Sequence, residues 1–207
     1  MDSSLEHVDL DHIEHLAHLM HDIPPQARVG RVRGAVLMLI FADALSVIAI
    51  MAAGGYLSAL NVLGQFKTSG VQAPAFLPGL LLAIVFALSG LFYYLWERGV
   101  RKNQGVGQRV FFILSWVLII GAVVGQVWYS ATLGYASPFH AYESLIELFS
   151  WYTAVHLLLT AIIGLLLLGR IINSRLVEHS YIAEASGYWW YYTVISSLIM
   201  WLFPLFL

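Results

Sequence analysis

Two side chains that can carry a proton lie inside long apolar stretches of the sequence. Asp43 lies in LMLIFADALSVIAI, residues 37–50, and His156 lies in a similar run later in the chain. Within a membrane, such groups usually face a protein interior or water, where they form ion pairs or relay protons. Asp43 and His156 could pair with each other. Alternatively, each could bond a hydroxyl such as Ser46 or Ser89, or a backbone carbonyl, and Asp43 could be neutral because desolvation disfavours its charged form.

The elements that position these groups follow from a strongly apolar composition. Of the 207 residues, 60% are hydrophobic and 11% are charged, whereas soluble domains usually have about 25% charged residues. Five blocks are long enough to cross a bilayer, which takes roughly 20 residues. They are residues 34–60, 76–96, 110–133, 145–168 and 187–207. We therefore predict an all-α polytopic membrane protein with a bundle of five transmembrane helices, because only helices satisfy the backbone of such blocks in lipid.

The basic residues are sorted among the connecting segments. Nine of the ten precede the first block or lie in the second and fourth loops, and Lys67 alone lies in a loop of the opposite set. The positive-inside rule then places the N-terminus in the cytoplasm and the C-terminus at the outer face. In this orientation Asp43 and His156 lie roughly 13 and 18 Å from the cytoplasmic ends of their helices, which is a comparable depth.

A polar segment, residues 1–33, precedes the transmembrane domain, residues 34–207. Ser3 and Glu6 have the spacing of a capping box and a Pro-Pro pair follows, so we expect a short amphipathic helix. Its polar face carries five histidines: His7, His12, His15, His18 and His21. The three-residue steps from His12 to His21 fan around the helix, which does not favour a metal site. Docking on a partner subunit is favoured over anionic lipid because no Lys or Arg precedes Arg28.

Signatures of catalysis are absent from the sequence. There is no cysteine, which excludes disulfides and cysteine-ligated clusters. His156 is the only histidine inside a predicted span, whereas a haem or copper site built from helices needs further histidines. The HExxH, P-loop and GxGxxG motifs do not occur. We expect no catalytic, cofactor-binding or metal-binding residue and no nucleic-acid partner. The chain is then a non-catalytic membrane subunit or a small transporter.

The last third of the chain resembles subunit III of haem–copper oxidases, the cytochrome c oxidase subunit 3 family. The strings that carry the resemblance are VHLLLTAIIGLLLLGR, residues 155–170, and EASGYWWYY, residues 184–192. Within them, His156, Arg170 and Glu184 match the family in residue type and spacing. The family has a penultimate helix with a His followed by an apolar run to an Arg, and its last helix opens with a Glu and an aromatic cluster.

Earlier segments carry other parts of the same family pattern. Asp43 and Tyr56 fit an acidic residue and a later aromatic residue of one family helix, and Gln126 in GQVWY fits its Q-x-x-E-Y segment. The full family form has seven helices, so this chain resembles a five-helix form that lacks the first two. The orientation deduced from charge agrees with that loss. The chain departs from the family's polar pattern at Tyr129, Thr153, Tyr191, Val194 and Ser197.

The resemblance implies a supporting role in an enzyme complex. Subunit III holds no redox centre, packs against catalytic subunit I, whose complex contains the haem and copper, and supports proton uptake, partly through bound phospholipid. The chain would be a bacterial inner-membrane protein of aerobic respiration, with Asp43 and His156 as buried polar anchors. Two alternatives stay open: a subunit III-like partner of nitric oxide reductase, and a small proton-coupled transporter that uses Asp43 and His156.

The aromatic run 188–192 lies where the last predicted span leaves the cytoplasmic face. Such residues are typical of the belt at a membrane interface. A sharper alternative is a lipid site that Trp189 and Trp190 contact and to which Arg170 or Arg175 contributes the cation.

Overall fold

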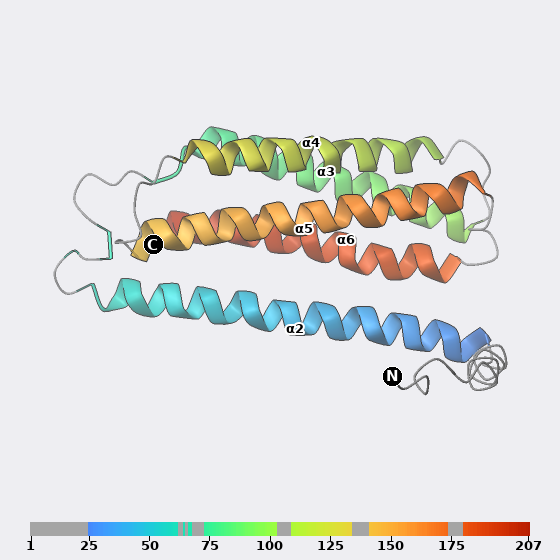
Figure 1. Ribbon diagram of the computed structural model, residues 1–207, viewed down its shortest axis with the longest axis horizontal. Helices are drawn as coiled ribbons and strands as arrows, with labels where there is room; N and C mark the ends of the chain where they lie inside the picture. The colour runs from blue at the N-terminus through green and yellow to red at the C-terminus, as the bar shows by residue number, and fades with distance from the viewer. Residues whose placement is uncertain are drawn as a thin grey trace, which may run out of the picture.

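The chain forms a bundle of long helices that run side by side along the long axis of the molecule (Figure 1). The computed structural model describes residues 25–61, 64, 66–67, 73–102, 109–133, 141–173 and 180–207. The elements are α2 (Pro25–Ala59), α3 (Phe76–Arg101), α4 (Arg109–Thr132), α5 (Ala141–Ile172), α6 (Ser180–Leu202) and the short 3-10 helix η2 (Phe203–Phe206). All five α-helices are long and apolar enough to cross a membrane. The predicted all-α polytopic membrane fold is therefore confirmed.

The helices extend beyond the predicted spans. α2 begins at Pro25, well before residue 34, in keeping with the preference of proline for the first helical turn. α3 ends at Arg101 with Arg98 and Arg101 in its last turn, where their charge complements the helix dipole. The amphipathic helix and the histidines predicted before Pro25 lie outside the described residues, as does Arg175.

Basic side chains gather at one end of the bundle. Consecutive helices run in opposite directions, so the start of α2 lies at the same end as the end of α3, the start of α4, the end of α5 and the start of α6 (Figure 1). We call this the basic end, and the opposite one the far end. The described basic residues at the basic end are Arg28, Arg31, Arg33, Arg98, Arg101, Lys102, Arg109 and Arg170. Lys67 lies at the far end, 4.4 Å over the Tyr142 ring.

Helices α3 to α6 form a four-helix core that is aromatic at its centre. Tyr93 and Trp190 stack with their ring centroids 4.5 Å apart. Trp190 is fully buried and donates a 2.9 Å hydrogen bond from Nε1 to Ser89 Oγ. The predicted lipid contact of Trp190 is therefore wrong, because its ring fills the core. On α5, a Cβ at Gly164 would collide with Trp116, whose indole lies against that glycine; small residues allow such close approach in membranes.

α2 lies along one side of this core, against α5 and α6 (Figure 1). In its most apolar 18-residue window 6% of the residues are buried, against 28–44% in the other four helices. Near the far end, a Cβ at Gly54 would lie 2.6 Å from Leu145 Cδ2, so α2 and α5 touch closely there. Near the basic end, Arg33 of α2 forms a 2.5 Å ion pair with Glu184 of α6. A third contact between α2 and the core lies between these two and is formed by hydrogen-bonding side chains around Asp43.

Candidate functional site

The middle of the interface between α2, α5 and α6 holds the two proton-carrying residues expected from the sequence. Asp43 stands halfway along α2 and His156 halfway along α5. His156 Nε2 lies 3.0 Å from Asp43 Oδ2. Of the two alternatives, pairing is therefore the one that the structure adopts.

Two tyrosines complete the coordination of the Asp43 carboxyl group. Tyr152 on α5 donates its hydroxyl hydrogen to Oδ1, and Tyr192 on α6 donates to Oδ2 at 2.5 Å. One carboxyl group thus joins three helices through three side chains. We call Asp43, Tyr152, His156 and Tyr192 the central cluster.

The tyrosine hydroxyls bond Asp43, whereas the serine hydroxyls named above as alternative partners do not. Ser46 Oγ donates to the backbone oxygen of Ala42 in its own helix. Ser89 forms hydrogen bonds with Ser115 and Trp190 in the four-helix core. Sequence reasoning missed Tyr152, although its position four residues before His156 places both on one helical face. Nothing in the sequence singled out Tyr192, except that it belongs to an aromatic run.

The hydrogen-bond geometry shows how many protons the Asp43–His156 pair holds. His156 Nδ1 lies 2.9 Å from the backbone oxygen of Tyr152. A carbonyl oxygen only accepts, so Nδ1 carries a hydrogen. The contact between Nε2 and Asp43 Oδ2 then requires one further proton, on either the imidazole or the carboxyl. Both arrangements give the pair a net charge of zero, which lowers the cost of burying it in an apolar environment.

Aromatic rings enclose the imidazole of the central cluster. His156 stacks between Tyr152, at a centroid distance of 4.1 Å, and Trp189, at 5.5 Å. The side chain of His156 is 7% exposed and that of Asp43 is 20% exposed. Asp43 is thus half-buried and not fully buried. It lies at the edge of the bundle, where Tyr152 and Tyr192 are also partly exposed, whereas His156 is buried.

A second cluster of charged groups joins α2, α3 and α6 at the basic end. Glu97 of α3 is buried, and it accepts hydrogen bonds from Arg101 and, at 2.5 Å, from the Tyr191 hydroxyl. Glu184 of α6 accepts from Arg33, and Arg101 lies 3.9 Å from it. Two carboxylates and two guanidinium groups balance each other here. Glu97 was missed because the predicted span ended at residue 96.

A groove between α2, α5 and α6 lies beside part of the aromatic run. The groove has a volume of about 380 Å³. Its wall includes Val32 and Val36 of α2, Ile163 and Arg170 of α5, and Ser186 and Trp189 of α6. Arg170 and Trp189 therefore line the same groove, with the guanidinium group at the basic end and the indole next to the central cluster. Its lining is otherwise mainly aliphatic.

Other residues matched to the family pattern lie in different surroundings. Tyr56 is 65% exposed near the far end of α2, 13 residues from Asp43, and so takes no part in the central cluster. Gln126 is buried between α4 and α5, where its Nε2 donates to Ser150 Oγ at 2.9 Å. Glu184 lies at the basic end in the ion pair with Arg33.

Among the described residues, no group of three or more His, Cys, Asp or Glu side chains is placed to hold a metal ion. The sequence matches no protein-family model and no curated protein.

Proposed function

We propose that this protein is a non-catalytic membrane subunit of a bacterial haem–copper oxidase complex, of the subunit III type. The observation that carries the proposal is the central cluster. Its other three side chains all bond Asp43, so the proton-carrying groups at mid-membrane serve to hold three helices together. Such a subunit stabilises the catalytic subunit and supports proton uptake in aerobic electron transport.

The residues on which the resemblance rests support this proposal through their contacts. His156 and Glu184, two family-matched positions, are the groups that attach α2 to the last two helices through Asp43 and Arg33. The proposed complex places haem and copper in partner subunits and none in this chain. The gathering of basic residues at one end supports a cytoplasmic N-terminus and an outer C-terminus in the inner membrane.

The groove beside the central cluster fits a bound phospholipid. An aliphatic wall would take an acyl chain, and Arg170 at the basic end would pair with the phosphate. We expect Arg170→Ala to lower the amount of phospholipid that copurifies with the protein about threefold, measured by native mass spectrometry. Arg109→Ala is the control, because Arg109 is also exposed at the basic end but does not line the groove. Equal lipid content in the two variants would argue against this site.

Purification of the tagged protein in mild detergent tests the assignment to an oxidase. A reduced-minus-oxidised spectrum with haem bands, together with a large multi-helix partner, would support it. Oxygen and nitric oxide consumption assays then separate an oxidase from a nitric oxide reductase complex. A colourless chain that purifies alone and is stable alone would refute the subunit assignment.

A small proton-coupled transporter is the second candidate, because the Asp43–His156 pair shares one proton near the middle of the membrane-spanning helices. Asp43→Asn separates the two functions. In a structural subunit, we expect the variant to reduce the amount of assembled complex severalfold while the complex that does assemble retains its initial turnover. In a transporter, the folded protein would lose proton-coupled uptake in proteoliposomes. Normal assembly combined with loss of uptake would contradict the subunit proposal.

A further inference from the structure

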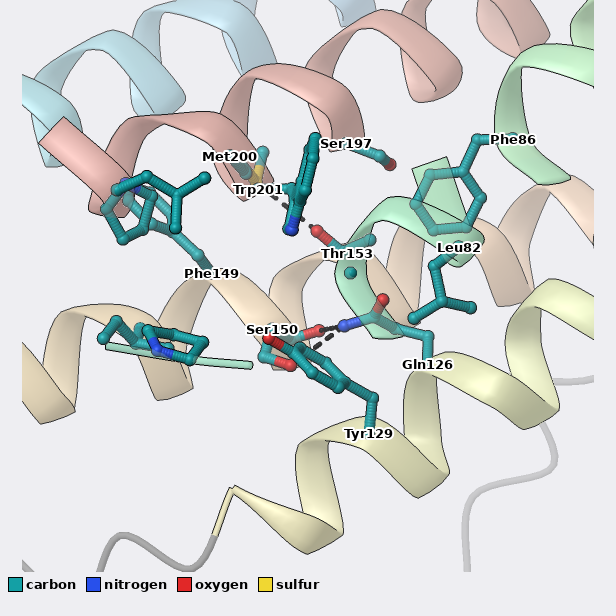
Figure 2. A pocket seen from close by; sticks show the side chains of 15 residues that line it. Leu82, Phe86, Gln126, Tyr129, Phe149, Ser150, Thr153, Ser197, Met200 and Trp201 are labelled. Carbon is teal, nitrogen blue, oxygen red and sulfur yellow. Dashed lines mark hydrogen bonds between the residues drawn. The ribbon is translucent and has the colours of Figure 1, made fainter. Parts of the chain in front are cut away.

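A small cavity lies at the centre of the four-helix core, in the half nearer the far end. Its volume is about 40 Å³. Helices α3, α4, α5 and α6 surround it, and Figure 2 shows side chains from all sides turned toward it. Leu82 and Phe86 form an apolar side, whereas Gln126, Thr153 and Ser197 contribute polar groups. This cavity is separate from the central cluster, none of whose four residues lines it.

Polar groups between α4 and α5 satisfy one another in a closed ring. Gln126 Nε2 donates to Ser150 Oγ at 2.9 Å, and Ser130 Oγ donates to the Gln126 backbone oxygen at 2.8 Å. Ser130 has one hydroxyl hydrogen, so the hydrogen in its 2.6 Å contact with Ser150 comes from Ser150. All donors of the ring are then in use. The Gln126 Oε1 acceptor receives no hydrogen bond from the described residues.

Ser197 on α6 has a hydroxyl group that bonds no described residue, so it could donate where Gln126 Oε1 could accept. Its side chain is 2% exposed, and its Oγ has no hydrogen-bond partner within the described part of the chain. In Figure 2 the Ser197 hydroxyl and the Gln126 amide oxygen lie on opposite sides of the same space. Thr153 donates only to Met200 Sδ, at 3.7 Å, which leaves the lone pairs of its hydroxyl oxygen open. Buried polar groups without partners are rare and costly in native proteins.

We propose that this cavity is a hydration site that holds about one to three ordered water molecules, given that one water needs roughly 10–15 Å³ of such space. Water both accepts and donates, so it can accept from Ser197 Oγ and donate to Gln126 Oε1 and to Thr153. Buried waters typically make about three hydrogen bonds, and the cavity offers that number. No charged side chain is among the described residues that line it, which disfavours an ion.

The position of the site gives the water a structural role. The helices of the core pack in a ring in which α4 contacts α3 and α5, and α6 contacts α5 and α3. α4 and α6 therefore lie diagonally across the core. Water between Gln126 and Ser197 connects these two helices where their own side chains do not meet. This role is independent of the proposed membership in an oxidase complex.

The sign of a stability change distinguishes a hydrated cavity from a dry one. In the hydrated cavity, Ser197→Ala removes a hydrogen bond to water, and we expect the thermal midpoint of the full-length protein to fall by about 1–3 °C. In a dry cavity, the same change removes an unpaired hydroxyl, and the midpoint would rise. Ser196→Ala is the matched control, because Ser196 Oγ already bonds the Thr193 backbone oxygen in its own helix. A rise beyond that of the control would overturn the proposal.

A cryo-electron microscopy map of the full-length protein, at a resolution that shows ordered water, provides the direct test. We expect a compact density peak about 2.6–3.2 Å from both Ser197 Oγ and Gln126 Oε1 or two peaks that link them. Ser197→Val places a methyl group in the space and should remove the peak nearest to it. An empty cavity, or elongated density from an acyl chain, would refute the hydration site.

Discussion

Replacing Asp43 by alanine is expected to lower the free energy of unfolding by about 2–4 kcal/mol, because three side chains lose one shared hydrogen-bond partner at once. These side chains are Tyr152, His156 and Tyr192, on the two helices that face α2. A single interhelical hydrogen bond in a membrane contributes about 0.6 kcal/mol on average and up to about 1.7. The loss should be measured by denaturation in mild detergent, followed through the fluorescence of the seven tryptophans.

The same substitution should detach α2 before it disturbs the four-helix core. The chain has no cysteine, so a single cysteine at Val47, a buried position of α2, reports its detachment without background. We expect a membrane-permeant maleimide to label this cysteine several times faster when Asp43 is alanine. Ser46→Ala is the control, because Ser46 bonds only within α2. Equal stability and labelling in the two variants would show that the central cluster does not hold α2.

Glu97→Ala is expected to cost about 2–3 kcal/mol of stability, because it leaves the partly buried Tyr191 hydroxyl without an acceptor and opens a void. Most of this loss comes from Tyr191 and the void. Arg101 is 54% exposed at its side chain, so water screens its pairing with Glu97. The thermal midpoint of the purified protein measures the change. Arg98→Ala, on the exposed face of the same turn, should leave it within about 1 °C, and an equal fall in both variants would refute the role of Glu97.

A double-mutant cycle with Gly187 tests the same packing from the opposite side. A Cβ at Gly187 would lie 2.9 Å from Glu97 Oε2, so Gly187→Ala should be destabilising in the native background. When residue 97 is alanine, that carboxylate is gone and the methyl group partly fills the void. We therefore expect the two changes together to cost less than the sum of their separate effects, by about 1 kcal/mol or more.

The five membrane-spanning helices could be predicted because composition decides whether a segment can lie in lipid. A chain this short has no soluble fold that would bury as many apolar side chains as runs such as residues 37–50 contain. Depth made a pairing of Asp43 with His156 possible but did not favour it over separate partners for each residue. Counting residues from the basic ends of two antiparallel helices placed both near one level, and the structure brings them to 3.0 Å.

Which face of each helix points inward could not be predicted. In a soluble bundle, polar residues mark the outer face, but a membrane helix is apolar on both its lipid side and its core side. Trp189 and Trp190 are neighbours about 100° apart around α6, and nothing in their types shows that Trp189 lines a groove while Trp190 fills the core. The same ambiguity hid the part that Tyr192 plays in the central cluster.

Because α2 is held to the other helices at few points, its partners matter during synthesis and membrane insertion of the chain. Asp43 emerges from the ribosome 109 residues before its first partner, Tyr152, which is roughly 5–22 s at 5–20 residues per second. During that interval the first helix occupies the bilayer with its carboxyl group unmatched, at a cost of about 2.5–3.5 kcal/mol on the insertion scale. Until its partners are made, only the apolar residues of α2 on both sides of Asp43 offset that cost. Once the last two helices are made, the same carboxyl group becomes the contact that joins α2 to them.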